Sequence, residues 1–184
     1  MFTRRFSDLA QALKKTAYQA GGNFLDETSW FYQARDALRS VAERGGIVYV
    51  IGNGGSAGIA SHFSNDLLKA RQIPSQTFYD SNVLTCLSND LGYDKVFSYP
   101  LQKLLKPQDL LVAISSSGQS QNILNAADVA VEKSTPLVTL SGFQSHNPLR
   151  TKGALNVWVG ESDYGLVENA HFFLLHTLID FWDL

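Results

Sequence analysis

Residues 47–57 read Ile-Val-Tyr-Val-Ile-Gly-Asn-Gly-Gly-Ser-Ala, and this stretch decides the fold. Five consecutive apolar residues without alternation are typical of a strand buried on both faces, as in a parallel sheet covered by helices. The glycine-rich segment that follows allows a tight turn, and a helix is predicted from Ala57 to Lys69. A strand, a glycine-rich turn and a helix in this order predict an α/β protein.

Working outward, the same character recurs along the chain. Further strands are predicted at Gln76–Tyr79, Leu110–Ile114, Leu137–Leu140 and Leu155–Val159. Further helices are predicted at Asn82–Ser88, Ser120–Lys133 and Tyr164–Trp182. The alternation predicts a doubly wound, mostly parallel five-stranded sheet flanked by helices.

Two helices are predicted before the first strand. In residues 2–20 the apolar side chains recur at helical spacing, at Phe2, Phe6, Leu9, Leu13 and Ala17. Residues 26–44 form the second predicted helix, which Asp26 can cap and Gly45 can close. Gly21-Gly22 and Gly45-Gly46 stand out as short linkers.

The whole chain, residues 1–184, is therefore interpreted as one domain. Residues 1–44 are its N-terminal helical pair and residues 45–184 its α/β core. The apolar stripe of the first helix needs a partner, and it either covers one face of the sheet or packs against another subunit. We favour the second, so residues 1–44 are expected to mediate oligomerisation.

Composition excludes several classes of function. The net charge of −2 and the pI near 6.0 argue against a nucleic-acid binder, which needs a basic surface. The single cysteine, Cys86, excludes a disulfide within the chain and a cysteine-based zinc site. No apolar run approaches about 18 residues, so no membrane partner is indicated, and the cytoplasm is the expected location.

Two loops can bind a phosphate group. Gly52–Ala57 follows the first strand and opens a helix, where backbone N–H groups and the Ser56 hydroxyl favour an anion. It matches neither the Walker loop nor the dinucleotide fingerprint, so no nucleotide cofactor is expected. Ser115-Ser116-Ser117-Gly118-Gln119-Ser120 lies in the same position after the strand at 110–114. Either loop alone could be an ordinary turn or cap, but ligands of open α/β sheets bind at the carboxyl ends of strands, so together they predict a phosphate site.

Candidate acid–base and metal-binding groups lie on two helices. His62 and Asp66 are four residues apart and therefore share one helix face. The last helix carries Glu168, His171 and His176. A single histidine is more often structural than catalytic, so both interpretations stay open for each of them.

Four ordered blocks resemble the SIS (sugar isomerase) domain family. They are GNGGSA at 52–57, SHFSNDL at 61–67, LSNDLGYDKVFS at 87–98 and ISSSGQSQN at 114–122. The chain is most similar to the phosphoheptose isomerase branch. That resemblance implies an aldose–ketose isomerase that converts sedoheptulose 7-phosphate to D-glycero-D-manno-heptose 7-phosphate, for the heptose of lipopolysaccharide or capsule.

The resemblance also implies the ligands of the sugar phosphate and the assembly of the protein. The phosphate would be held by the two loops, and the Asn-Asp pair would lie near the substrate. The implied residues are Asn53, Gly54, Gly55, Ser56, Asn89, Asp90, Ser115, Ser116, Ser117 and Ser120. Members of the family commonly form homotetramers with sites between subunits.

The family's catalytic positions are matched only in part. Its first-helix His is His62, its catalytic Glu falls on Asp66, and its last-helix His is His176. Its last-helix Gln falls on Glu168, and an Asp that holds sugar hydroxyls falls on Gly165, with Asp163 nearby. By resemblance, His62, Asp66, Glu168 and His176 form a metal set that suits one Zn²⁺ per site.

An enediol pathway follows from these parts. Asp66 is assigned as the base, Glu168 as its substitute and His176 as the partner acid/base. We expect His62, Asp66, Glu168 and His176 to converge on one pocket beside the serine-rich loop at residues 115–120. The alternative function is a non-catalytic sugar-phosphate-binding or adaptor protein, like the branch of the family that regulates the replication initiator, or an isomerase of another sugar phosphate.

Overall fold

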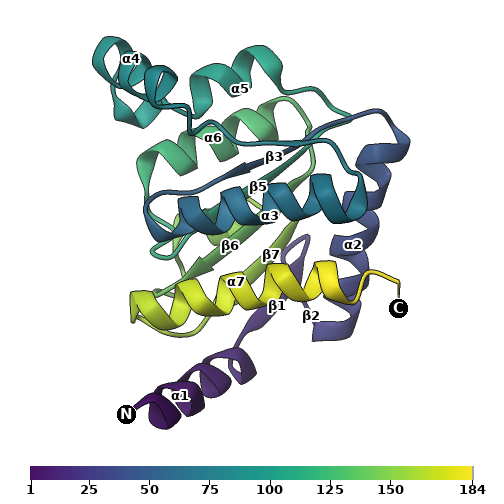
Figure 1. Ribbon diagram of the computed structural model, residues 1–184, viewed down its shortest axis with the longest axis vertical. Coiled ribbons are helices and arrows are strands. Elements are labelled where there is room, and N and C mark those ends of the chain that lie inside the picture. The colour runs from purple at the N-terminus through teal and green to yellow at the C-terminus, as the bar shows by residue number, and fades with distance from the viewer. Residues whose placement is uncertain (184) are drawn as a thin grey trace.

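A seven-stranded sheet forms the middle layer of the computed structural model, which describes residues 1–183, in the order β2-β1-β7-β6-β5-β3-β4 (Figure 1). Its parallel strands are β3 (Val48–Ile51), β4 (Ser75–Gln76), β5 (Leu110–Ser115), β6 (Leu137–Gly142) and β7 (Leu155–Val159). The register places Val50 beside Val112, and Leu140 beside both Ile114 and Val157. Four of the five predicted strands lie close to their expected bounds, and the one predicted at Gln76–Tyr79 is the shorter β4; together they form the predicted doubly wound parallel sheet.

The prediction of five strands and of a purely helical N-terminal pair is wrong in one respect. A hairpin of β1 (Ala17–Ala20) and β2 (Asn23–Leu25) follows the first helix, and β1 pairs antiparallel with β7. Gly21 and Gly22 form its turn at φ values of 54° and 83°, which glycine adopts without strain and which a two-residue hairpin turn requires. The hairpin covers the edge of β7 that would otherwise be unpaired.

The helices pack on both faces of the sheet. α2 (Glu27–Glu43), α3 (Gly55–Arg71) and α7 (Tyr164–Asp180) cover one face, while α5 (Ser98–Leu104) and α6 (Gln121–Glu132) cover the other. α1 (Phe2–Lys14) lies against the start of α7, and α4 (Ser81–Leu91) lies at the far end of the molecule (Figure 1). Two short 3₁₀ helices are also present, η1 (Tyr93–Lys95) before α5 and η2 (Pro148–Thr151) before β7.

Most of the predicted helices have close to their expected bounds. α1 is the exception, because it ends at Lys14 rather than at residue 20. Asp26 caps α2 as predicted, accepting a hydrogen bond from the Ser29 backbone N–H at 2.9 Å, and Gly45 follows the helix end at φ 66°. The helix α5, which carries Pro100, was not predicted.

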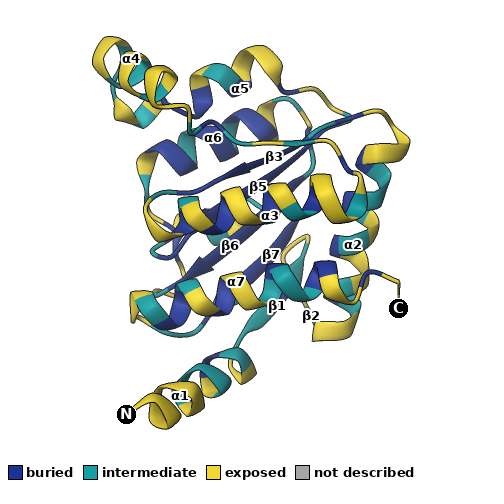
Figure 2. Cartoon of the chain, in the orientation of Figure 1, coloured by how far each residue is buried: buried dark blue, intermediate teal, exposed yellow. Residues whose placement is uncertain are grey.

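Alternation along each strand divides the core in two. Val48 and Val50 face α2, α3 and α7, whereas Tyr49 and Ile51 face α5 and α6, and all four are buried. Figure 2 shows the same arrangement, with buried strands between half-exposed helices. No helix among residues 1–183 is long and apolar enough to cross a bilayer.

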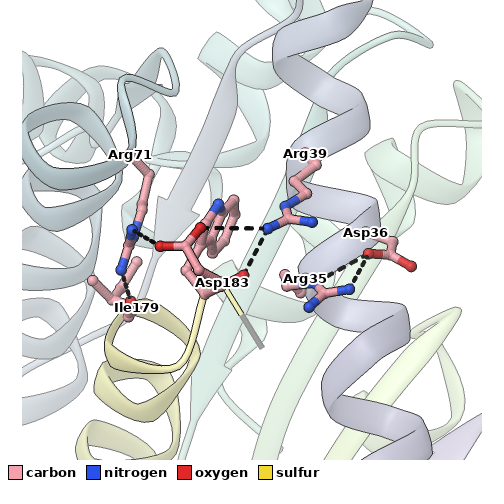
Figure 3. A network of polar contacts seen from close by, with 7 residues as sticks. Arg35, Asp36, Arg39, Arg71, Ile179 and Asp183 are labelled. Carbon is pink, nitrogen blue, oxygen red and sulfur yellow. Dashed lines mark hydrogen bonds and ion pairs between the residues drawn. The ribbon is translucent and has the colours of Figure 1, made fainter.

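A polar network fixes the ends of α3 and α7 (Figure 3). Arg71 donates to the carbonyl oxygen of Ile179, and Arg39 donates to that of Trp182 at 2.6 Å. Both guanidinium groups also lie over the Trp182 ring, that of Arg39 at 5.2 Å and that of Arg71 at 5.6 Å from its centre. Both are within ion-pair distance of Asp183. These contacts set the register of α3 against α7, which carry the candidate acid–base residues.

Candidate active site

A cavity of about 230 Å³ lies at the carboxyl ends of β3 and β5. The glycine loop (Gly52–Ala57) and the serine loop (Ser115–Ser120) line it together, with two residues of α7 on the remaining side. Its lining is Asn53, Gly54, Gly55, Ser56, Ile114, Ser115, Ser116, Ser117, Ser120, Tyr164 and Glu168. We name it the serine cavity. The structure therefore brings the predicted phosphate-binding residues of both loops together.

The glycine loop is held in place by its own backbone conformation and by the Tyr79 side chain. Gly54 has φ 54° and ψ −122°, a conformation that a residue with a side chain adopts only under strain. The Tyr79 hydroxyl donates to the Gly52 carbonyl oxygen at 2.9 Å and accepts from the Gly52 N–H at 2.7 Å. Burial raises the pKa of Tyr79 well above its usual value, so this hydroxyl stays protonated.

Asn53 is fully engaged within the protein. Its amide exchanges two hydrogen bonds with Asn122 at the start of α6, at 2.8 and 2.9 Å, and its Oδ1 also accepts from the Tyr93 hydroxyl at 3.1 Å. These bonds tie the glycine loop to α6. Asn53 thus positions the loop, and Asn122, which the sequence reasoning did not single out, is its buried partner.

The serine loop presents hydroxyl groups at the start of α6. Ser115 Oγ lies 3.3 Å from Ser120 Oγ, and Ser117 Oγ accepts from the Gln119 N–H at 3.2 Å. Ser116 Oγ is buried and makes no hydrogen bond within residues 1–183. Since α3 and α6 both begin at the cavity, their unpaired first N–H groups and positive dipole ends favour an anion there.

Three candidate acid–base groups meet farther along α3 and α7. Asp66 Oδ2 lies 3.0 Å from His62 Nε2 and 3.2 Å from His176 Nδ1, and the three ligand atoms are all within 4.8 Å of one another. Asp66 Oδ2 and His176 Nδ1 are buried, and neither makes a hydrogen bond with another group in residues 1–183, although they lie within ion-pair distance of each other. We name His62, Asp66 and His176 the His–Asp–His cluster.

Phe172 packs against both histidines of this cluster. Its ring centre is 4.9 Å from that of His62, and it stacks on His176 at 5.7 Å with an angle of 10° between the rings. A groove of about 290 Å³ leads toward Phe172 from Gly55 and Glu168, along Gly58 and Ile59. The groove therefore runs from the serine cavity toward the His–Asp–His cluster.

Glu168 does not join the cluster within residues 1–183. It lies two helical turns before His176, about 12 Å along α7 at 1.5 Å per residue. Its carboxylate lines the serine cavity and the groove and lies against Gly55, where a Cβ atom would be only 2.2 Å from Oε2. Three of the four groups predicted to converge thus meet one another, but it is Glu168, and not these three, that lines the cavity beside the serine loop.

The other residues singled out from the sequence lie outside the cavity. Asn89 and Asp90 are exposed on α4, where the Asn89 amide donates to the Asp90 carboxylate at 2.9 Å. Asp163 caps α7 and pairs with Arg5 of α1 at 2.5 Å, and the hydrogen bond from Arg5 lowers the Asp163 pKa. At Gly165 an added Cβ would approach the Arg5 guanidinium at 3.0 Å.

His171 has a structural role. It is fully buried, its Nε2 lies 3.1 Å from the carbonyl oxygen of Ser141, and burial lowers its pKa to about 4. It is therefore neutral near pH 7, and Nε2 must carry the hydrogen to donate to that carbonyl. Of the two interpretations left open by the sequence, the structure supports the structural one for His171.

Comparisons with known proteins agree with this fold and identify the family. Residues 24–142 match the family model described as SIS domain, so the chain belongs to the SIS domain family. The phosphoheptose isomerase of Campylobacter concisus is 36% identical over 137 residues, which cover 71% of this chain and 72% of that relative. The phosphoheptose isomerase of Shewanella denitrificans is 33% identical over 141 residues, 72% of each chain.

Solved structures give the same result over the full length. The phosphoheptose isomerase of Neisseria gonorrhoeae superposes with a TM-score of 0.83 at 25% identity, covering 99% of this chain and 97% of that one. That of Francisella tularensis also gives 0.83, at 28% identity and with 99% and 96% coverage. Within the SIS domain family, the chain is thus related to the phosphoheptose isomerases.

Proposed function

We propose that this protein is an aldose–ketose isomerase that converts sedoheptulose 7-phosphate to D-glycero-D-manno-heptose 7-phosphate, for the heptose of lipopolysaccharide or capsule. The observation that carries the proposal is the groove that leads from the serine cavity toward the His–Asp–His cluster. One end of it suits a phosphate and the other suits acid–base chemistry. The names of the relatives and of the superposed structures support the same activity.

The length of the groove supports a long sugar phosphate. In an extended seven-carbon chain, about 1.25 Å of advance per carbon–carbon bond places the carbonyl carbon roughly 9 Å from the phosphorus. The serine cavity and the cluster are separated by two turns of α7, about 12 Å along the axis between Glu168 and His176. With the phosphate in the serine cavity, the carbonyl end of a heptose phosphate would extend most of the way to the cluster, farther than that of a shorter sugar phosphate, with the sugar hydroxyls beside Glu168.

The chemistry we propose is proton transfer through an enediol. A carboxylate removes the proton from C1 of the ketose, a partner acid/base moves a proton from the C1 oxygen to the C2 oxygen, and the carboxylate returns its proton to C2. Asp66 is the proposed base and His176 the proposed partner, because their side chains lie 3.2 Å apart next to Phe172, which lines the groove. Glu168 is the proposed substitute base, because it lies in the groove itself.

The His–Asp–His cluster has the donors that zinc prefers. Two imidazole nitrogens and one carboxylate oxygen lie within 4.8 Å of one another, and two of these three atoms are buried without a hydrogen bond in the described part of the chain. Three protein ligands with one open position are typical of catalytic zinc sites. When bound, the metal would polarise the substrate carbonyl and stabilise charge on its oxygen.

The test is conversion of sedoheptulose 7-phosphate, followed by NMR of the product with and without chelator. If the cluster binds metal that the reaction needs, Asp66→Asn loses bound zinc and activity together, whereas Glu168→Gln retains zinc. If catalysis needs no metal, the parent resists the chelator, and the variant of the true base loses activity on the order of 10²–10⁴-fold. A parent enzyme that turns over neither this nor other sugar phosphates would refute catalysis.

The second candidate is a non-catalytic sugar-phosphate-binding or adaptor protein. Two observations favour it: Glu168 lies apart from the cluster, and Gly165 offers no carboxylate to hold sugar hydroxyls. It would bind sugar phosphates in the serine cavity without converting them. Binding without turnover in the NMR assay would therefore support it.

We further propose a homotetramer that uses the outer half of α1, in the cytoplasm. Leu9 and Leu13 pack against the residues at the start of α7, whereas Phe2 and Phe6 stay 90% and 72% exposed. The stripe predicted from the sequence is thus half covered by the chain itself. Another copy of the chain is the proposed cover for the remainder.

A further inference from the structure

A second polar cavity, of about 520 Å³, lies beside the β1–β2 hairpin. It is lined by the hairpin, by the segment between β6 and β7 and by β7, and it shares no lining residue with the serine cavity or the groove. The lining is Gln19, Gly22, Phe24, Ser145, Arg150, Thr151, Gly153 and Asn156. Its volume is within the range of small-molecule sites.

The cavity lies on a part of the sheet that no long helix covers. Leu155 and Val157 of β7 belong to the core under α2, α3 and α7, so Asn156 and Trp158 face the opposite side of the sheet. On that side α6 packs over β5 and the neighbouring strands, and only η2 lies near β7. The hairpin extends this uncovered face and supplies Gln19, which pairs with Asn156 in the register.

Arg150 is held rigidly in this cavity. Its Nε donates to Gln19 Oε1 at 2.9 Å, one terminal nitrogen donates to the Ser145 carbonyl oxygen at 2.8 Å, and its guanidinium lies 4.6 Å from the centre of the Trp158 ring. The other terminal nitrogen makes no hydrogen bond within residues 1–183. A fixed guanidinium with a free edge is well suited to a carboxylate or phosphate.

The charge of Arg150 is not balanced by the cavity. No acidic residue is among the lining residues, so Arg150 has no carboxylate partner in the cavity. Other cations do have one: Arg5 pairs with Asp163, and Lys152 pairs with Asp128. At the wall, Asn156 is 1% exposed, and its Oδ1 makes no hydrogen bond among residues 1–183. Buried acceptors of this kind are rarely left unpaired. The cavity thus lacks an anion to pair with Arg150, and Asn156 Oδ1 behind its wall lacks a donor from the described part of the chain.

We propose that this cavity is a second ligand site, which binds a small hydroxylated anion. The carboxylate or phosphate of the ligand pairs with the free edge of Arg150, and its hydroxyl groups lie along the polar wall of the cavity. Ser145 and Thr151 line the same cavity and suit further hydroxyl groups. The proposal does not depend on the isomerase activity, because the two sites share no residue.

Isothermal titration calorimetry tests the site in a protein that carries Ser117→Ala and Ser120→Ala, so that the serine cavity is weakened. The probes are D-gluconate, D-glucose 6-phosphate and neutral D-sorbitol. At least one anion should bind with a stoichiometry of one, and sorbitol should not bind. The two anions distinguish a carboxylate from a phosphate ligand.

Three further substitutions in that background assign the site. Arg150→Gln should weaken anion binding on the order of tenfold to a hundredfold, the range for a hydrogen bond to a charged group. Gln19→Glu keeps the shape and the bond to Arg150 but neutralises its charge, so it should weaken binding similarly. Lys152→Gln removes the same charge outside the cavity and should leave affinity unchanged.

The results that overturn the proposal are equally specific. They are failure of both anions to bind, anion binding that persists in Arg150→Gln and Gln19→Glu, or sorbitol binding as strong as that of the anions. Thermal unfolding of each variant shows that it is folded. Because Gln19→Glu should form a stronger bond to Arg150, its loss of binding could not be attributed to unfolding.

Discussion

Gly55→Ala tests whether the position of the Glu168 carboxylate matters for catalysis. Gly55 is the first residue of α3 and its backbone does not require glycine, since its φ is not positive. A Cβ atom there would lie 2.2 Å from Glu168 Oε2, whereas ordinary contacts begin at 3.4 Å. The carboxylate must therefore retreat by about 1.2 Å along its flexible side chain.

The expected effects on stability and on activity differ. Stability should stay within about 1 kcal/mol of the parent, because alanine favours the helix by about 0.4–1 kcal/mol and the side chain that moves is flexible. A displacement of about 1 Å at a reacting group can cost on the order of 100-fold in rate. If Glu168 acts on the substrate, kcat for sedoheptulose 7-phosphate should fall by that order.

The assay is NMR of the product for Gly55→Ala, Glu168→Ala and the double variant. In the Glu168→Ala background the added methyl group displaces no carboxylate, so Gly55→Ala should have little further effect. Full additivity of the two losses would mean that the methyl group acts on the cavity and not through Glu168. Unchanged kcat in Gly55→Ala would refute the idea that the Glu168 position is catalytic.

Four further predictions follow from the site and the fold. Ser117→Ala with Ser120→Ala should weaken phosphate binding by about tenfold or more in calorimetry, and unchanged affinity would exclude the serine loop as the phosphate site. Gly58→Ala should leave phosphate binding unchanged but raise KM for the sugar phosphate, because its methyl group enters the groove; an unchanged KM would place the sugar elsewhere. His171 stays neutral in the fold with a pKa of about 4, so between pH 7 and pH 5 its protonation in the unfolded chain should cost about 2 kcal/mol of stability. Urea unfolding should show this loss in the parent and not in His171→Gln, and equal losses would contradict it. Deletion of residues 1–14 should convert the oligomer to smaller species in light scattering, and an intact assembly would exclude α1 as its interface.

The parallel core was predictable because its strands are buried on both faces. Continuous apolar runs such as 47–51 and 110–114 are typical of strands in a parallel sheet covered on both faces. The loops after parallel strands meet at the same edge of the sheet, so their proximity was predictable too. The hairpin β1–β2 was missed because Ala17 continues the helical spacing of the residues before it. The Gly21-Gly22 pair carried the correct signal, since two adjacent glycines between short β-compatible segments are typical of a hairpin turn.

The partners of the glycine loop could not be found from spacing alone. Tyr79 and Asn122 contact the loop from elements 27 and 69 residues away in sequence. Nothing local distinguishes a tyrosine that fixes a loop from one that fills a core, because the distinction depends on which backbone groups the fold leaves unpaired. Only the folded sheet shows that, among residues 1–183, the N–H and C=O groups of Gly52 both lack a backbone partner and need a side chain that can accept from one and donate to the other.

The separation of Glu168 from the cluster comes from where its side chain lies, since it lines the serine cavity. His62 and Asp66 are four residues apart and so meet on one face of α3. Glu168 and His176 are eight residues apart, which places their Cα atoms about 12 Å apart along the helix axis, and the Glu168 carboxylate lies against Gly55 rather than beside His176. Glu168 thus lies beside the proposed phosphate site, whereas the cluster lies beyond Phe172, at the other end of the groove. For Glu168 to act as the base at C1, the sugar must bend back from the serine cavity toward Gly55. For Asp66 to do so, the sugar must extend along the groove past Phe172. The Gly58→Ala substitution separates these two poses, because its methyl group obstructs only the extended one.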